Sequence, residues 1–303
     1  MTTATSTAVI SHAGTTQFRA WGSELSGQLT TIGFIKSSDT GQINWTTVTR
    51  PAVGVAGGYE IRYMNDSMHS TAPIYVKLEY GTDAANAAYP AMWITIGTGS
   101  NGSGTITGIV VAREQFQGGA SALDSTVLAK VSYACMSNGC VWFAFKTKVR
   151  VSSTFPAFCM AIERTKDNSG TSTGDGFVYN RGTYLYGNAS SSTTVYIFGT
   201  GYTVNSTGAA DFGGGSGGYA WMPYGIGTTG TIVSGVPGNM QLARHWLVTP
   251  EIRPLLCTVS QSVGDAIASG TTFTATVLGV TSHTYMSLER AFSNVDHICA
   301  IWE

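Results

Sequence analysis

The chain has 303 residues, of which 38 are glycine and only 11% are charged, and its formal net charge is −1. The charged fraction is less than half of that usual in soluble domains, and the lysines and arginines are scattered rather than clustered. Because there is no basic stripe to attract phosphate groups, direct binding of nucleic acid is not expected. Aromatic and β-branched residues recur throughout, which argues against a disordered chain.

The first ten residues lack the basic start and apolar run of a secretory signal. No stretch reaches the roughly 20 apolar residues that span a bilayer. We therefore expect synthesis in a cytoplasm, without membrane insertion. In that compartment the five cysteines are expected to be reduced thiols, mostly in the core. They are Cys135, Cys140, Cys159, Cys257 and Cys299.

Residues 16–29 carry a helical pattern, because apolar side chains recur at spacings of three and four along one face. The pattern predicts a short N-terminal helix that docks its aromatic edge on a sheet or on a neighbouring subunit. The apolar residues of this face are Phe18, Trp21, Leu25, Leu29 and Ile32.

After the helix the hydrophobic period changes to two, which is typical of strands with one face in water. In the first such strand, the apolar positions Tyr59, Ile61 and Tyr63 alternate with Glu60 and Arg62. In the second, Ile74, Val76, Leu78 and Tyr80 alternate with Tyr75, Lys77 and Glu79. Further strands are predicted at residues 91–96, 105–111, 127–134, 141–149, 157–163, 177–179, 184–186, 195–198, 230–234, 241–248, 255–259, 271–277, 284–288 and 298–302.

Turn signals separate these strands. Asn138-Gly139 predicts a hairpin. With a two-residue turn Ser137 faces Cys140, and with a four-residue turn Cys135 and Cys140 can meet and oxidise. Asn180-Arg-Gly182 lies between two short strand patterns, and residues 199–218 form a glycine-rich stretch. The polar stretch 165–176 is either an interdomain linker or the tip of a long hairpin.

These patterns predict an all-β fold of antiparallel sheets, arranged as a β-sandwich or jelly-roll-like structure, with one short N-terminal helix. The predicted organisation is an N-terminal β domain over residues 1–164 and a C-terminal β domain over residues 177–303. A single elongated β domain is the alternative.

Two motifs known from enzymes match this sequence in their residue pattern but not in their expected structural context. Gly97-Thr-Gly-Ser-Asn-Gly102 fits the dinucleotide pattern G-x-G-x-x-G, but a strand follows it instead of a helix, which predicts a hairpin turn. Gly214-Gly-Ser-Gly-Gly218 fits the G-x-S-x-G elbow but lies in a low-complexity loop. The five histidines are isolated from one another in the sequence, and no second Cys or His pair lies near Cys135 and Cys140. We therefore expect no catalytic residue, no metal and no cofactor.

Aromatic residues cluster around the glycine-rich stretch 199–218, and aromatic side chains on loops often serve recognition. Together with Trp21 of the predicted helix, they are the candidate recognition or interface residues, and ordinary packing is the alternative. The cluster comprises Tyr196, Tyr202, Tyr219, Trp221 and Tyr224.

Five sequence blocks carry a resemblance to one family. They are Phe18-Arg-Ala-Trp-Gly-Ser-Glu-Leu25, Ser38-Asp-Thr-Gly-Gln-Ile-Asn-Trp-Thr-Thr-Val48, Gly58-Tyr-Glu-Ile-Arg-Tyr-Met-Asn-Asp66, Ala72-Pro-Ile-Tyr-Val-Lys-Leu-Glu-Tyr-Gly81 and Trp93-Ile-Thr-Ile-Gly-Thr-Gly-Ser-Asn-Gly102. Over residues 18–110 the chain resembles structural, tail-associated proteins of tailed-bacteriophage particles. The resemblance implies a virion component at the tail tip, baseplate or fibre attachment, and it supplies no active-site residues.

Low charge, β patterning and this resemblance favour a non-enzymatic assembly protein. Its expected partners are copies of itself, for example in a trimer, and other virion structural proteins. It would be made in the host cytoplasm and end in the virion. Two alternatives stay open: a capsid decoration protein, and a module on the tail that binds a host receptor or surface glycan. An enzyme carried on the tail, such as a capsule hydrolase, is disfavoured.

Overall fold

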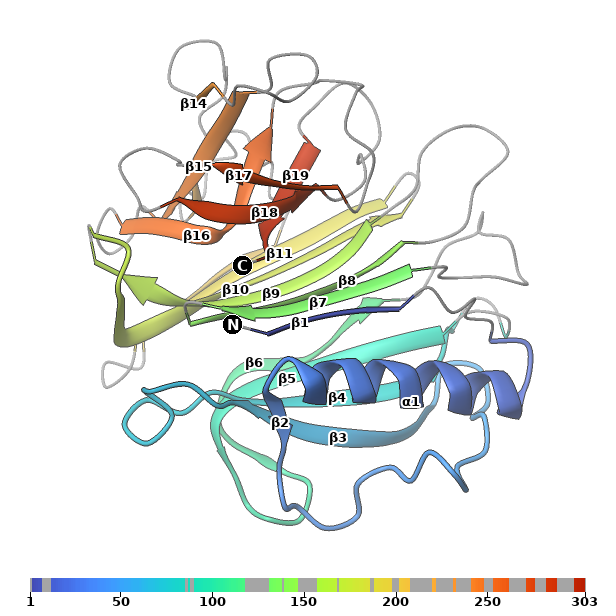
Figure 1. Cartoon of the computed structure of the whole chain (residues 1–303). Helices are drawn as coiled ribbons and strands as arrows, with labels where there is room; N and C mark the ends of the chain where they lie inside the picture. The colour runs from blue at the N-terminus through green and yellow to red at the C-terminus, as the bar shows by residue number, and fades with distance from the viewer. Residues whose placement is uncertain are drawn as a thin grey trace.

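The computed structural model describes residues 2–6, 12–84, 87, 90–117, 131–137, 139–146, 157–167, 169–185, 188–197, 202–207, 220–221, 231–232, 241–247, 253–261, 271–275, 282–287 and 297–302. Beyond residue 179, side chains are described only for residues 271–274, 282–286 and 301–302. In this part of the chain, three antiparallel sheets are stacked on one another and one helix lies near the N-terminus (Figure 1). The predicted all-β class with antiparallel sheets and a single N-terminal helix is confirmed.

The N-terminal sheet has the strand order β2-β3-β4-β5-β6, with β2 at Phe34–Lys36, β3 at Ala56–Met64, β4 at Tyr75–Thr82, β5 at Pro90–Ser100 and β6 at Ile106–Gln117. The central sheet has the order β1-β7-β8-β9-β10-β11-β12, with β1 at Thr2–Ser6, β7 at Val131–Ser137, β8 at Cys140–Lys146, β9 at Ala157–Lys166, β10 at Ser172–Leu185, β11 at Asn188–Ile197 and β12 at Tyr202–Thr207. The C-terminal sheet has the order β13-β15-β16-β19-β18-β17, and β14 also pairs with β15. Its strands are β13 at Ala220–Trp221, β14 at Thr231–Ile232, β15 at Gln241–Leu247, β16 at Arg253–Gln261, β17 at Thr272–Ala275, β18 at His283–Ser287 and β19 at His297–Ile301.

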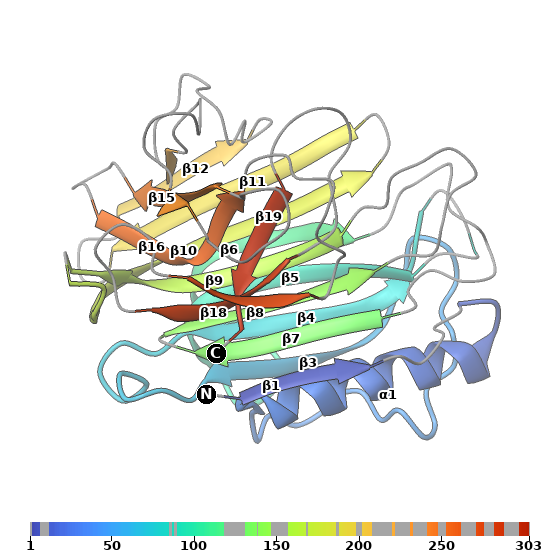
Figure 2. The ribbon, with the colours of Figure 1, turned by 45° about the horizontal axis from the view of Figure 1, so that its top comes forward.

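The helix α1 spans Thr15–Thr31, where the sequence predicts a helix over residues 16–29. It lies along β1 and also contacts β2 and β7, so it continues the layer of the central sheet (Figure 2). Its apolar residues Phe18, Trp21, Leu25 and Leu29 are at most 1% exposed. The helix gives way to β2 at Gly33, whose φ of 88° is a left-handed conformation that glycine adopts readily.

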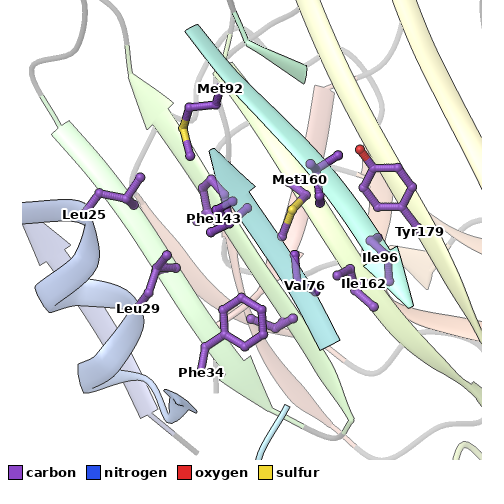
Figure 3. Packing of buried hydrophobic residues seen from close by; sticks show 14 of the residues in the cluster. Leu25, Leu29, Phe34, Val76, Met92, Ile96, Phe143, Met160, Ile162 and Tyr179 are labelled. Atoms are coloured by element: carbon purple, nitrogen blue, oxygen red, sulfur yellow. The ribbon is translucent and has the colours of Figure 1, made fainter. Parts of the chain in front are cut away.

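The main core lies between the N-terminal sheet on one side and α1 with the central sheet on the other (Figure 3). Leu25 of α1 and Val76 of β4 share this core with Phe143 of β8 and Ile162 of β9. All four side chains are at most 1% exposed, and burying one such side chain stabilises the fold by about 1.5–3 kcal/mol. Because the helix and both sheets line the same core, they form one packed unit.

A buried arginine links the N-terminal sheet to the central sheet through an ion pair and a hydrogen bond. Arg164 of β9 forms a bidentate ion pair with Asp66, in which Nε lies 2.5 Å from Oδ2 and Nη2 lies 2.9 Å from Oδ1. Its Nη1 donates to the main-chain oxygen of Ala72 at 2.8 Å. Asp66 and Ala72 belong to the connection between β3 and β4, so this connection is fixed to the neighbouring layer.

The opposite face of the central sheet packs on the C-terminal sheet. Trp142 of β8 donates from Nε1 to the main-chain oxygen of Ile301 at 2.6 Å, and its ring centroid lies 5.9 Å from that of Trp302. β16 lies against β8 and β9. The strand predicted over residues 298–302 is confirmed, because β19 is paired on both sides, with β16 and β18.

The structure confirms one of the turns expected from the sequence and contradicts another. The turn at Asn138-Gly139 is confirmed, since Ser137 pairs with Cys140 and Gly139 has a φ of 68°. Residues 165–176 include the tip of the β9–β10 hairpin, the second of the two alternatives for this stretch. The division of the chain into two domains stays a prediction. The break expected at Asn180-Arg-Gly182 is wrong, because pairing with β9 on one side and β11 on the other keeps β10 continuous.

The expectation of reduced cysteines is wrong for Cys140, which is disulfide-bonded, and holds for Cys135, a buried thiol outside any disulfide that donates to the main-chain oxygen of Trp302. These two are not opposite each other, since Cys135 pairs with Trp142. Cys159 pairs with Ala144, four positions from Cys140, and at about 3.3 Å per residue roughly 13 Å separates the two, too far for a disulfide. Sequence spacing failed here because it does not reveal which cysteines a folded chain brings together.

The state of the two thiols can be tested by alkylation. When protein purified without reductant is denatured and treated with iodoacetamide, we expect modification of Cys135 but not of Cys140. After reduction both residues should be modified, as peptide mass spectrometry would record. Alkylation of Cys140 before reduction would contradict the disulfide.

Candidate interaction surface

An ion pair is buried under α1. Glu60 and Arg62 of β3 are both 0% exposed and lie on the face of the sheet that the helix covers. The alternation in the sequence implied the reverse, with these two residues in water and Tyr59, Ile61 and Tyr63 toward the core. The period of two is right but the face is inverted, because α1 supplies hydrogen-bonding partners that the strand pattern alone does not reveal.

Both oxygens of the Glu60 carboxylate accept hydrogen bonds. Oε2 accepts from Nη2 of Arg62 at 2.8 Å and from Nε at 3.0 Å. The other donors to Glu60 are Ser26 Oγ at 2.7 Å, Tyr80 OH at 3.1 Å, Trp45 Nε1 at 3.2 Å and Lys36 Nζ at 3.3 Å. Arg62 also donates to the main-chain oxygens of Phe34 at 2.7 Å and Ser26 at 2.9 Å. The cluster thus joins the helix, three strands and the loop that carries Trp45.

The pKa values of the ionisable groups in this cluster indicate that it stabilises the fold. Burial raises the pKa of Glu60, but the charge of Arg62 and the hydrogen bond from Ser26 outweigh it and hold this pKa below its ordinary value. Burial and the nearby Glu60 carboxylate raise the pKa of Tyr80 well above its ordinary value. At neutral pH the cluster is therefore a carboxylate, a guanidinium and a neutral phenol, with no group poised to exchange a proton. Since Glu60 and Arg62 are fully buried, they cannot contact a substrate.

A second polar cluster shapes the turn between β5 and β6. Asp39 accepts hydrogen bonds from the hydroxyls of Ser37 and Ser100 and from the N–H of Gly104. Burial raises the pKa of Asp39, but these hydrogen bonds outweigh it and lower the pKa overall. Gly104 has a φ of 93°, and a Cβ there would lie 2.1 Å from the hydroxyl oxygen of Tyr59, so the turn requires glycine. The turn therefore fixes the position of the Tyr59 ring.

The face of the N-terminal sheet turned away from the central sheet carries several partly exposed aromatic side chains. The strand register sets Tyr63 directly opposite Tyr75, and Glu79 opposite both Tyr59 and Trp93. This outer face comprises Tyr59, Tyr63, His69, Tyr75, Lys77, Glu79, Trp93, Ile109 and Arg113.

Three rings of the outer face form a stack. His69 lies in the connection that Arg164 links to the central sheet. The ring centroids of His69 and Tyr63 are 4.3 Å apart with 25° between the ring planes, and those of Tyr75 and Tyr63 are 5.6 Å apart. Nδ1 of His69 is buried and has no hydrogen-bond partner in the described part of the chain. Burial, Tyr63 and Asp39 raise the pKa of Tyr75, so its phenol stays neutral at pH 7. The three partly exposed rings therefore offer aromatic surface on the outer face.

The charged groups of the outer face interact with one another or with its rings. Nε of Arg113 donates to Oε2 of Glu79 at 2.7 Å, and the guanidinium lies 4.6 Å from the Trp93 ring centroid. Nζ of Lys77 lies 4.3 Å from the centroid of Tyr59. Ile109 is 59% exposed. Aromatic rings, an arginine and an exposed aliphatic side chain are typical of protein interfaces.

Trp21, a candidate recognition or interface residue with ordinary packing as the alternative, is packed inside the fold of the single chain. The side chain is 1% exposed and packs edge-on against Tyr80 with 5.8 Å between ring centroids. The aromatic edge of the helix docks on the chain's own sheet, the first of the two options in the sequence pattern, so no aromatic face remains for a neighbouring subunit.

The aromatic cluster predicted around residues 199–218 remains a prediction. Tyr196, Tyr202 and Trp221 lie on β11, β12 and β13, where the structure describes the backbone alone. Tyr219 and Tyr224 lie outside the described residues. The sequence did not identify the outer face as a site, although Tyr75, Lys77 and Glu79 alternate with core residues, which was the available signal.

The described residues contain no group of three metal-ligating side chains close enough to hold an ion. Nor does this part of the chain include a helix with the length and apolar character to span a bilayer. The hairpin predicted at Gly97–Gly102 is confirmed, since residues 97–100 end β5 in pairing with β6 and residues 101–105 form the turn between the two strands. The polar clusters described above join the helix to the sheet and shape the turn between β5 and β6.

The buried ion pair can be tested by substitution. Glu60→Gln keeps the shape of the side chain but leaves Arg62 charged and uncompensated, so we expect a loss of about 3–5 kcal/mol in the free energy of unfolding at pH 7. The control Glu79→Gln breaks the exposed pair with Arg113 and should cost about 1 kcal/mol or less. Chemical denaturation would measure both variants, and equal losses would contradict the role of Glu60.

The same variant has a pH signature. Because the folded state lowers the pKa of Glu60 below its ordinary value of 4.5, its stabilising contribution is present above that pH and is lost as the pH falls through the folded pKa. The difference in stability between wild type and Glu60→Gln should therefore narrow in strong acid.

No protein-family model matches this chain, and no curated protein and no solved structure matches it either.

Proposed function

We propose that this chain is a non-enzymatic structural protein of a tailed-phage particle, at the tail tip, baseplate or fibre attachment, which assembles with copies of itself and with other virion proteins. The observation that supports this most is where the charged groups lie. Glu60 with Arg62, and Asp66 with Arg164, form ion pairs that hold layers together inside the fold. The outer face is left with rings, one exposed aliphatic side chain and charges that are already paired.

The resemblance in the sequence supports the same proposal. It extends over residues 18–110, and in the structure this range contains most of α1 and most of the N-terminal sheet. The outer face therefore lies almost entirely in the part that resembles phage structural proteins. Symmetric oligomers commonly bury such partly apolar surfaces between copies.

Self-association through the outer face can be tested at Ile109. We expect Ile109→Asp to weaken self-association at least tenfold, because the contact would bury an unpaired carboxylate. Val53 is 46% exposed, lies near the far end of the sheet and provides the matched control Val53→Asp, which should associate as wild type does. Size-exclusion chromatography with light scattering over a range of concentrations would measure the oligomer. A wild-type monomer at all concentrations, absent from purified particles, would refute the proposal.

A host-receptor or glycan-binding role is the second candidate, favoured by the partly exposed aromatic rings of Tyr63, His69 and Tyr75. For this role we expect Tyr63→Ala to abolish adsorption to host cells while particles still assemble. Tyr219→Ala and Trp221→Ala test the cluster predicted from the sequence in the same way. Normal adsorption of all three variants would discard the role. Imaging of labelled protein in the particle would distinguish a tail component from a capsid decoration protein.

A further inference from the structure

Cys140 lies on the face of the central sheet that packs on the C-terminal sheet. Side chains alternate between the two faces of a strand, so Cys140 shares its face with Trp142, two positions further along β8. Nε1 of Trp142 donates to the main-chain oxygen of Ile301 at 2.6 Å, so this face meets β19. The alternate residues Val141 and Phe143 lie in the main core on the opposite face. Cys140 is 2% exposed, so its disulfide is buried where the two sheets meet.

The strand register excludes the two other cysteines of the central sheet as the partner of Cys140. A disulfide requires about 4.4–6.8 Å between Cα atoms. Cys159 lies roughly 13 Å from Cys140 along the β8–β9 pair. Cys135 is two positions away from the residue opposite Cys140, and Cα atoms at such diagonal positions are about 7–8 Å apart. The thiol of Cys135 donates instead to the main-chain oxygen of Trp302 at 3.2 Å.

The two remaining cysteines of the sequence belong to strands of the C-terminal sheet, Cys257 to β16 and Cys299 to β19. Cys299 is two positions before Ile301. Thr258 pairs with Ala300, so the same register continued by one position sets Cys257 opposite Ile301. Both backbone positions are therefore within about 7 Å of the residue that accepts the hydrogen bond from the tryptophan of β8. β16 also packs directly on β8.

We propose that the disulfide of Cys140 is a covalent link between the central and C-terminal sheets, closed by Cys257 or Cys299 on the C-terminal side. Its formation removes two protons and two electrons from two thiols, and the acceptor is a small disulfide such as oxidised glutathione, which is reduced to two thiols. The link closes a loop from residue 140 to residue 257 or 299. In the chain-entropy model, closing a loop of about 100 residues shifts the folding equilibrium toward the native state by about 10³-fold. The link does not depend on the proposed virion role.

The link makes the attachment of the C-terminal sheet depend on redox conditions. In reducing surroundings the two sheets are held together by noncovalent contacts alone, such as the hydrogen bond from Trp142 to Ile301. In oxidising surroundings they are also joined covalently. Because Cys140 is buried, a reductant reaches the bond only when the sheets separate, so a link that has closed is slow to reopen.

Peptide mapping of the full-length protein, equilibrated with oxidised glutathione, alkylated and digested with trypsin without reductant, identifies the partner. Trypsin cleaves after Lys and Arg but not at Arg253, because Pro254 follows it. The relevant peptides are 131–146 with Cys135 and Cys140, 151–164 with Cys159, 245–290 with Cys257 and 291–303 with Cys299. We expect peptide 131–146 to be linked to 245–290 or to 291–303, and the intact protein to run as a monomer in a denaturing gel without reductant. A link to 151–164, a link within 131–146, a link between copies or the absence of any link at Cys140 overturns the proposal.

Matched variants test what the link does for the C-terminal sheet. Cys140→Ser cannot form it, whereas Cys135→Ser keeps it and its hydroxyl can still donate to Trp302. After equilibration with oxidised glutathione, we expect hydrogen-exchange protection of β15, β16 and β19 to be at least tenfold lower in Cys140→Ser than in wild type, and unchanged in Cys135→Ser. Refolding under reductant should lower the protection of wild type to that of Cys140→Ser. Equal protection in wild type and Cys140→Ser under oxidising conditions contradicts the role of the link, and if Cys140→Ser does not fold, the peptide map of the wild-type protein still decides.

Discussion

The ion pair between Glu60 and Arg62 is the constraint on which the arrangement of the layers depends. Removing a carboxylate and a guanidinium from water costs several kcal/mol each, and this cost is offset only while all their hydrogen bonds are made. Those hydrogen bonds come from Ser26 and Thr30 of the helix and from the adjoining strands and loop. The helix can therefore occupy only one position on the sheet. β1 packs beside the helix, so this position also determines where the central sheet begins.

The positions of the charged side chains explain the composition of the outer face. The sequence contains 16 lysines and arginines and 17 aspartates and glutamates, a small number for its length. Several of them lie inside the fold, where they connect elements across layers: Glu60, Arg62, Asp66 and Arg164. The outer face is consequently rich in rings, and its remaining charges interact with those rings or with one another. In the proposed assembly role, this is the surface that contacts other subunits.

The sequence predicted the local structure well and the assignment of faces poorly. The helix, the hairpin at Asn138-Gly139 and the strand at the C-terminus follow from periodicity and turn chemistry, which are local properties. The inversion of β3 and the bonding of Cys140 could not be predicted, because both depend on residues far away in the chain. Glu60 shows this most directly: its buried position requires Ser26, and no strand pattern identifies a helix 34 residues earlier as the cover.

The contact between Trp142 and Ile301 has a consequence for biosynthesis. The two residues are 159 positions apart, so at about 5–20 residues per second the ribosome needs roughly 8–32 s to produce the partner of Trp142 after Trp142 itself. During that interval Trp142 lacks its contact with β19, and until β16 is made the same face also lacks the strand that packs on β8 and β9. The nascent chain therefore exposes apolar surface of the central sheet until the C-terminal strands follow.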